Sequence, residues 1–177
     1  MDQPPIRGTI ATRVTYLEMR APPAGMAPPA APPGATVYRL DRPDPATYRV
    51  LFDRAGRDWT WTARKLLSDA TLARIINDPR VGIFMVTIDG AEAGFIELDS
   101  MLPGEVEISY FGIFPEYHGR KLGRFLLGWG IHHAWTVLHT ERLWVHTCTL
   151  DHPAALPLYR KMGFLPYDER EETVDLI

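Results

Sequence analysis

Residues 107–124 read EISYFGIFPEYHGRKLGR, and the interpretation of the whole chain starts from them. Val106–Ile113 has the β-branched and aromatic composition of a strand, which Pro115 ends. A polar turn follows, and Gly119 and Gly123 lead into an apolar helix. The start of this helix carries three cations, Arg120, Lys121 and Arg124. Free backbone N–H groups, positive charge and small residues at a helix start predict a pyrophosphate-binding turn.

A second segment, residues 151–164 (DHPAALPLYRKMGF), follows an expected strand at 142–150. Together the two segments resemble the signature motifs of the GNAT superfamily of N-acyltransferases, in the family's order and spacing. The family's first motif is a Gln/Arg-x-x-Gly-x-Gly/Ala turn that binds acyl-CoA, and Gly119 and Gly123 match it. Its second motif is Asn-x-x-Ala-x-x-Leu-Tyr-x-x-x-Gly-Phe, which is matched at Ala155, Leu158, Tyr159, Gly163 and Phe164. The resemblance implies a CoA-binding core over about residues 81–167.

Three positions depart from these motifs. His118 stands where the family has Gln or Arg, Lys121 stands at its middle glycine, and His152 replaces its Asn. The histidines either supply hydrogen bonds to CoA or mark a changed ligand. Lys121 keeps its backbone N–H, and its ammonium group either faces phosphate or crowds the turn.

Length and composition limit the other possibilities. The 177 residues are 46% hydrophobic and 23% charged, which fits a single domain over residues 1–177 with a sizeable core. A net charge of -3 argues against a general role on nucleic acid or a membrane surface. Cys148 is the one cysteine, and the N-terminus lacks a signal-peptide core. We therefore expect a cytoplasmic protein with no transmembrane segment.

The first 80 residues are expected to hold one strand and two helices. Ile10–Met19 has the composition of a first strand, and a Pro/Ala-rich loop over residues 21–36 follows it. This tract is interpreted as a surface loop, with a flap over the substrate site as the alternative. One helix is expected from the N-cap Asp44 to Gly56, and another after the N-cap Ser68.

The middle of the chain predicts the sheet. Val81–Ile88 and Ala91–Asp99 flank an Asp-Gly pair that is typical of a hairpin, and a Pro-Gly pair then leads to the motif strand. A crossover to residues 142–150 completes a mixed sheet, and residues 168–177 offer a final edge strand. The expected fold class is α/β: a central mixed twisted sheet flanked by helices, the GNAT-like acyl-CoA N-acyltransferase fold.

Three residues are candidates for catalysis. The resemblance implies that Tyr159 donates a proton to the thiolate of CoA; the alternative is a tyrosine that packs its helix on the sheet. Glu107 is the candidate base. If the hairpin folds symmetrically about Leu102, Glu97 lies directly across from Glu107, and two adjacent carboxylates raise one pKa toward the range of a base. A solvated or salt-bridged pair, or a base acting through water, remains open.

The resemblance also implies where CoA binds. Its pyrophosphate is expected on the backbone N–H groups of Gly119–Arg124, and its pantetheine amides along Phe111–Ile113 as an added strand. His152 and Tyr159 would close the other side. The expected CoA-binding residues are Phe111, Gly112, Ile113, His118, Gly119, Arg120, Lys121, Leu122, Gly123, Arg124, His152, Ala155 and Tyr159.

The acceptor side is less defined. Trp59 and Trp61 lie in the region that shapes the acceptor pocket of the family, and they either line a site for an apolar or cationic amine or belong to the core. His146 and Cys148 share one face of a strand, where a covalent acyl intermediate competes with a core-filling cysteine. No metal-ligand spacing occurs, so no metal is expected.

The sequence thus predicts an N-acetyltransferase. It would transfer the acetyl group of acetyl-CoA to a primary amine of an unidentified small molecule or peptide, by direct attack in a ternary complex. The alternatives are a non-catalytic acyl-CoA sensor and a partner-binding module on the same fold. A homodimer is left open.

Overall fold

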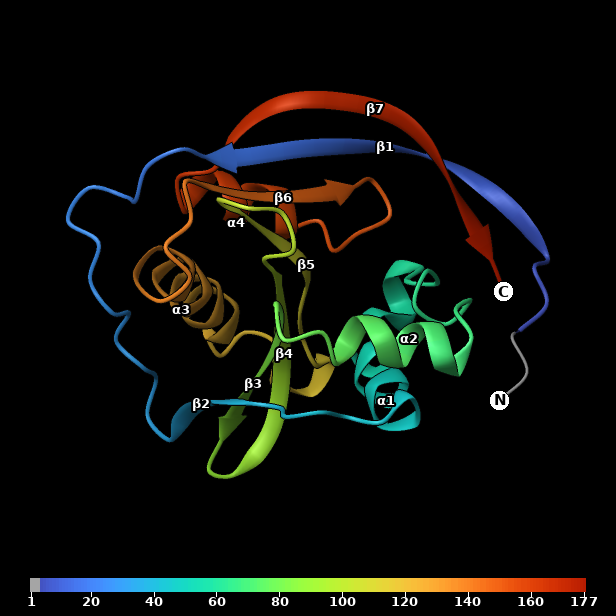
Figure 1. The fold of residues 1–177 in the computed structure, drawn as a ribbon, viewed down its shortest axis with the longest axis horizontal. Coiled ribbons are helices and arrows are strands. Elements are labelled where there is room, and N and C mark those ends of the chain that lie inside the picture. Colours follow the sequence, from blue (N-terminus) through green and yellow to red (C-terminus); the bar gives the residue numbers. More distant parts are fainter. Residues whose placement is uncertain (1–3) are drawn as a thin grey trace.

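The structure is a computed structural model that describes residues 4–177 as a seven-stranded sheet with helices on both faces (Figure 1). The strands are β1 (Gly8–Met19), β2 (Ala35–Arg39), β3 (Val81–Ile88), β4 (Ala91–Asp99), β5 (Glu105–Ile113), β6 (Arg142–Cys148) and β7 (Leu165–Leu176). They lie in the order β2-β3-β4-β5-β6-β1-β7. Neighbours are antiparallel except β5 and β6, which are parallel. The predicted mixed α/β sheet is confirmed.

The helices are α1 (Pro45–Gly56), α2 (Asp69–Ile76), α3 (Leu122–Thr136) and α4 (Ala155–Lys161), with 3₁₀ turns η1 (Arg57–Trp59) and η2 (Pro115–Tyr117). Helices α1 and α2 begin at the N-caps that the sequence predicts. The Asp44 carboxylate accepts a hydrogen bond from the Thr47 N–H (2.9 Å), and the Ser68 hydroxyl accepts one from the Thr71 N–H (3.2 Å). Both α1 and α2 follow β2, a five-residue strand that the sequence pattern missed.

Two apolar clusters hold the helices on opposite faces of the sheet. Against α3 and α4 the core is built from Leu17, Ile96, Leu98, Val106, Ile108, Leu126, Val145 and Phe164. Against α1 and α2 it is built from Tyr48, Phe52, Leu72, Ile83, Met85, Phe95 and Phe114. Residues alternate between these clusters along β4, as expected for a strand that is covered on both faces.

The first strand has an unexpected position. β1 lies inside the sheet between β6 and β7, so the two ends of the chain pair with each other, Gly8 opposite Leu176. The Pro/Ala-rich tract then passes α3 on the side away from α1 and α2 and reaches β2 at the opposite edge (Figure 1). Pro29 packs on α3 at Gly128, where an added Cβ would lie 3.4 Å from the proline ring. The loop interpretation fits this position, and the tract contributes no residue to the cavity described below.

A β-bulge in β5 changes the register that we expected. Leu98 pairs with Ile108 and Glu97 pairs with Tyr110, which leaves Ser109 as an extra residue. The prediction that Glu97 lies directly across from Glu107 was wrong even before the bulge, because the hairpin is centred one residue later than Leu102 and places Asp99 opposite Glu107.

The bulge also exchanges the faces of the residues that follow it. Val106 and Ile108 pack in the α3/α4 cluster, as do Phe111 and Ile113, whereas Tyr110 joins the α1/α2 cluster. Strict alternation had placed Tyr110 with Ile108 and Phe111 on the opposite face. An extra residue reverses the side-chain pattern, because a strand has a period of two.

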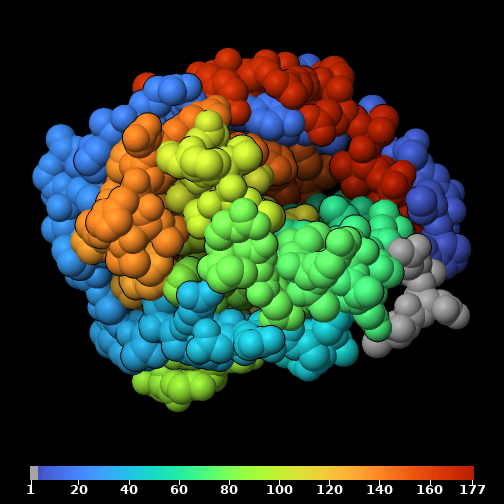
Figure 2. All heavy atoms as spheres, in the orientation of Figure 1, coloured from blue at the N-terminus to red at the C-terminus, as the bar shows by residue number. Residues whose placement is uncertain are grey.

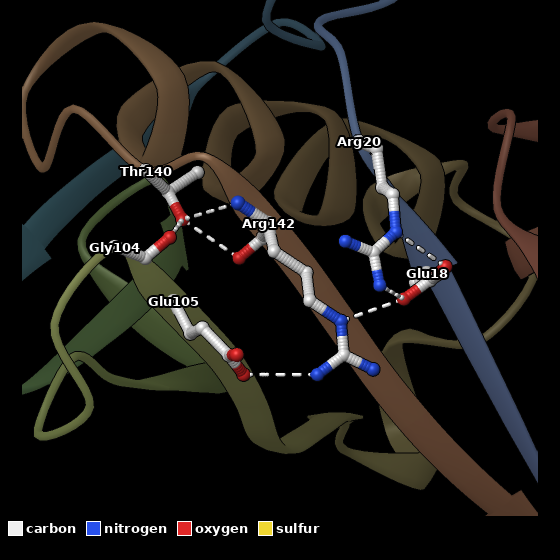
Figure 3. Close-up of polar contacts among 6 residues, drawn as sticks. All are labelled: Glu18, Arg20, Gly104, Glu105, Thr140 and Arg142. Atoms are coloured by element: carbon white, nitrogen blue, oxygen red, sulfur yellow. Dashed lines mark hydrogen bonds and ion pairs between the residues drawn. The ribbon is translucent and has the colours of Figure 1, made fainter.

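Arg142 ties three strands together at the start of β6 (Figure 3). Its guanidinium donates to Glu18 on β1 (2.6 Å) and to Glu105 on β5 (2.9 Å). The Thr140 hydroxyl beside it lies within donor distance of two carbonyl oxygens, those of Arg142 (2.7 Å) and Gly104 (3.0 Å). β5 and β6 pair only over Glu105–Ile108, so this network clamps the closed end of a pair of strands that diverge afterwards.

A buried ion pair fixes the segment between η1 and α2. The carboxylate of Glu97, fully buried, accepts hydrogen bonds from Arg64 Nη2 and from the Tyr48 hydroxyl, each at 2.5 Å. Burial raises the pKa of Glu97, and the charge of Arg64 opposes that shift. The carboxylate is thus committed to a structural contact between β4, α1 and the α1–α2 loop.

We predict that Arg64→Met lowers the free energy of unfolding by about 3–5 kcal/mol at about pH 8, because Glu97 would keep a buried charge without a counter-ion. The loss should shrink as the pH falls, since protonation removes that charge. Urea unfolding at about pH 8 and about pH 5 measures both effects.

The double variant Arg64→Met/Glu97→Gln should recover much of the stability, because it removes both charges. Arg13→Met is the matched control, since its exposed pair with Glu171 should contribute little. Equal losses in Arg64→Met and Arg13→Met would contradict the prediction.

Candidate active site

A cavity of about 680 Å³ opens where β5 and β6 diverge. Its walls come from β5, β6, the α1–α2 loop, the start of α3, α4, and the β1/β7 ribbon. Figure 2 shows a hollow between the red β7 strand and the green segment around α2, with brown atoms of the β6 region at its base. The divergence thus creates the cavity, and segments distant in sequence enclose it.

Most of the predicted CoA-binding residues meet in this cavity. Its lining includes Phe111, Gly112, Ile113, His118, Gly119, Lys121, Leu122, Gly123, His152, Ala155 and Tyr159. Arg120 and Arg124 are not part of the lining; the Arg120 guanidinium lies over the Tyr117 ring at 5.3 Å. The two arginines therefore add positive charge near the turn but do not form part of the cavity surface.

The start of α3 is built to leave backbone N–H groups free. Lys121 is the N-cap residue, and its side chain makes no capping hydrogen bond. It therefore leaves the N–H groups of the first helical turn without a capping acceptor. Gly119 and Lys121 both have positive φ, 78° and 62°. A left-handed lysine costs about 1–2 kcal/mol, a cost that glycine avoids at this position. The uncapped turn and its helix dipole favour an anion.

Beyond the bulge, one edge of β5 has no strand partner. Phe111–Ile113 continue to pair with β4, but their pairing with β6 has ended at Ile108. Gly112 lets the α1 helix approach closely, because a Cβ there would lie 2.8 Å from the Cβ of Ala55. His118 Nε2 contacts the Ile113 carbonyl oxygen at 2.9 Å. The free edge can hydrogen-bond an extended chain of amides.

Tyr159 lies at the inner end of this edge. It projects from α4 into the lining of the cavity and is only 5% exposed, between the rings of Phe111 and Phe164. Burial raises the pKa of its hydroxyl, so the phenol keeps its proton at neutral pH. The side chain therefore both packs α4 on the sheet and presents an O–H donor to the cavity.

His146 is a functional candidate that the analysis of the sequence did not single out as a base. It lines the cavity from β6, and its Nδ1 lies 3.3 Å from a carboxylate oxygen of Glu107. The hydrogen bond to Glu107 raises the pKa of the imidazole. Glu107 itself is not part of the lining. The parallel β5/β6 register, which pairs Glu107 with Trp144, brings the two side chains together, and no local sequence signal encodes that register.

The two predicted acceptor-site tryptophans both line the cavity. Trp61 Nε1 donates to the Asp151 carboxylate (3.1 Å), and its ring contacts Phe52 and Tyr110, so it serves the core and the cavity at once. Trp59 lies against His152, with 4.7 Å between ring centroids. These contacts join the α1–α2 loop to the loop that follows β6.

Glu97 is absent from the lining, so the structure does not bring it to the cavity. Cys148 is a free thiol on the lining, and burial raises its pKa. Within the described part of the chain, no group of three or more His, Cys, Asp or Glu side chains is arranged for a metal ion. No helix there is long and apolar enough to span a bilayer.

Comparison with known proteins agrees with this geometry. Mycothiol acetyltransferase from Streptomyces griseus is 32% identical over 156 residues, covering 82% of this chain and 48% of that protein. Mycothiol acetyltransferase from Tsukamurella paurometabola is 31% identical, covering 87% of this chain and 56% of that protein. The chain thus spans about half the length of the curated relatives it matches.

A solved structure and a family profile also match the chain. A GCN5-related N-acetyltransferase from Kribbella flavida superposes with a TM-score of 0.64 at 17% identity, covering 95% of this chain and 60% of that chain. The profile of the Acetyltransferase (GNAT) family matches residues 46–164, which include the uncapped turn and Tyr159. The chain therefore belongs to the GNAT family of acetyltransferases.

Proposed function

We propose that this protein is an acetyl-CoA-dependent N-acetyltransferase that acts on a primary amine in a ternary complex. The observation that carries the proposal is the continuity of the cavity. It runs from the uncapped start of α3, along the unpaired edge of β5, to the buried hydroxyl of Tyr159. An anion site, an edge for amides and a proton donor follow one another in the order that CoA presents its pyrophosphate, pantetheine and thioester.

Each part of the chain has a defined task in binding. Backbone N–H groups from Gly119 to Arg124 would hold the pyrophosphate, with the Lys121 ammonium close by. The Phe111–Ile113 backbone would pair with the pantetheine amides. His118, which contacts the Ile113 carbonyl, and His152 lie edge to face with their ring centroids 5.4 Å apart, and would border the chain together.

The transfer step needs a neutral amine. An amine with a pKa of about 10.4 loses its proton at pH 7 at a cost of about 4–5 kcal/mol. His146 would take that proton, and Glu107 would position the imidazole and stabilise its charged form. The amine nitrogen then bonds to the acetyl carbon while the carbon–sulfur bond breaks. Tyr159 would give its proton to the departing thiolate, and the second proton that the nitrogen loses as the amide forms would restore the phenol.

This assignment replaces the two-carboxylate base that we expected. Glu107 keeps a part in it, as the partner of His146, whereas Glu97 has none because Arg64 and Tyr48 hold its carboxylate. The proposal needs no metal ion. It places the reaction in the cytoplasm, which the single cysteine supports because no intrachain disulfide can form.

A sensor that binds acyl-CoA without turnover is the second candidate. The left-handed Lys121 at the position of the family's middle glycine favours it, since the side chain changes the phosphate turn. Product formation separates the two candidates, because a sensor binds acyl-CoA and releases no CoA thiol.

We predict that acetyl-CoA stabilises the wild type by about 2.7 kcal/mol at a hundredfold excess over its dissociation constant. Gly123→Trp should abolish this shift, because the indole would fill the space at Phe111, Ile113 and Leu158, which an added Cβ already meets at 3.8–3.9 Å. Thermal unfolding with acetyl-CoA, CoA and no ligand measures it.

Val137→Trp is the matched control for this experiment. It adds the same indole at an exposed position beyond the other end of α3, so the ligand shift should persist. A wild type that no CoA species stabilises would sink the proposal, and an undiminished shift in Gly123→Trp would remove CoA from this turn.

We also predict the pH dependence of kcat/KM. His146 acts as a base only when neutral, and Glu107 raises its pKa, so the rate should fall with decreasing pH through a limb above about pH 6.5. Glu107→Gln removes the largest of the causes that raise the pKa of His146, the others being the charges of Asp151 and Glu172, so this limb should move to lower pH. Tyr159→Phe should lower the rate without moving the limb. An unchanged limb in Glu107→Gln would exclude His146 as the base.

A further inference from the structure

The cavity has a second half that the CoA-binding residues do not occupy. We call it the acceptor half. It consists of lining residues from β1, the end of β6, β7 and the α1–α2 loop: Thr12, Val14, Trp59, Thr60, Trp61, Thr62, Ala63, Tyr110, His146, Cys148, Asp151, Glu172 and Val174. Under the proposed function, on which this inference rests, the amine enters here.

The charges of this half all have one sign. Asp151 and Glu172 are its carboxylates, and Glu107 stands behind His146. Among residues 4–177, Lys121 is the one Lys or Arg side chain on the cavity lining, and it belongs to the α3 start in the CoA half. The acceptor half therefore has acidic groups and no lining Lys or Arg side chain.

The two carboxylates are held by neutral donors. Asp151 accepts from the Thr147 hydroxyl (2.8 Å), the Cys148 N–H (2.9 Å) and Trp61 Nε1 (3.1 Å). Glu172 accepts from the Tyr16 hydroxyl at 2.6 Å, and this contact together with burial raises the pKa of Tyr16 to about 12. Hydrogen bonds of this kind fix the carboxylates in place and leave their charge uncompensated.

The nearest cations are already paired with other carboxylates. Arg170 lies over the Tyr16 ring at 4.8 Å and donates to Asp168. Arg64 lies over the Tyr110 ring at 5.2 Å and is bound to Glu97. Arg13 lines a smaller adjoining cavity, which shares Trp59 and Asp151 with the acceptor half, and its guanidinium pairs with Glu171. None of them offers a free guanidinium to an anion in the acceptor half.

The remaining wall is aromatic. Trp59, Trp61 and Tyr110 line the cavity, and the Trp61 indole is oriented by its hydrogen bond to Asp151. The faces of such rings attract ammonium groups and give no compensation to a carboxylate. Aromatic faces and fixed acidic groups thus favour the same kind of ligand.

We propose that the acceptor is a cationic amine without a carboxylate or phosphate group, and that the site discriminates against amines that carry one. A diamine fits the charges best: one nitrogen is acetylated, and the second ammonium lies between the acidic groups and the aromatic wall. An amino acid with a free carboxylate would bring like charges together in a partly desolvated cavity, which opposes binding.

Two matched pairs of amines test the proposal with the whole chain. Cadaverine and lysine differ by one carboxylate, as do tyramine and tyrosine. Calorimetric binding to the CoA-saturated protein and acetylation followed by thiol release are measured for all four. The member without the carboxylate should bind and react better by at least about tenfold in each pair.

Glu172→Gln should reduce this preference, because it removes the charge and keeps an oxygen that accepts from Tyr16. Glu171→Gln is the matched control: the same substitution one residue earlier, on the opposite face of β7, should leave the preference unchanged. An equal loss in the two variants would show a general charge effect and overturn the assignment to the acceptor half.

The outcomes separate this inference from the proposed function. Acetyl-CoA binding is measured first, and its absence overturns both. If acetyl-CoA binds while lysine and tyrosine bind or react as well as their partners, this inference alone is overturned. The same holds if acetyl-CoA binds and neither cadaverine nor tyramine binds at millimolar concentration.

Discussion

An unpaired residue in β5, Ser109, separates a closed end of the sheet from an open one. Before it, β5 pairs with both neighbours, and after it the pairing with β6 ends. The divergence leaves main-chain groups at Phe111–Ile113 without strand partners, which a packed sheet does not tolerate unless a ligand or solvent satisfies them. The bulge also turns Tyr110 toward the α1/α2 side, where it lines the cavity. The face of Tyr110 follows from this local change in register, and the unpaired edge of β5 begins beside it.

Two arginines, Arg142 and Arg64, join the elements around the open end through ion pairs. Arg142 clamps β1, β5 and β6 at the closed end, and Arg64 with Glu97 anchors the α1–α2 loop to β4 beside the cavity. The carboxylate of Glu97 is buried in that contact, whereas Glu107 lies beside His146, the base that we propose.

The position of β1 gives the acceptor half its character. Because β1 lies between β6 and β7, the N-terminal strand brings Thr12 and Val14 to the cavity, and β7 brings Glu172. The Tyr16–Glu172 hydrogen bond crosses these two strands and holds the carboxylate. Strands β1 and β7 therefore shape the side of the cavity that we propose for the acceptor, while β5 and the start of α3 shape the side that we propose for CoA.

The local motifs by themselves determined the fold class, the caps of α1 and α2, the hairpin at Asp89 and most of the cavity lining that we propose for CoA. Each of these depends on residues close together in the sequence, such as a capping side chain or a glycine turn. Only the tertiary structure decided that Asp99 rather than Glu97 lies opposite Glu107, which face of β5 carries Tyr110, and where β1 joins the sheet. A bulge shifts register without a local signal, and the pairing of strands distant in sequence depends on burial across the whole sheet. For the same reason, the contact between His146 and Glu107 and the acidic acceptor half appear only when β1, β6 and β7 are assembled.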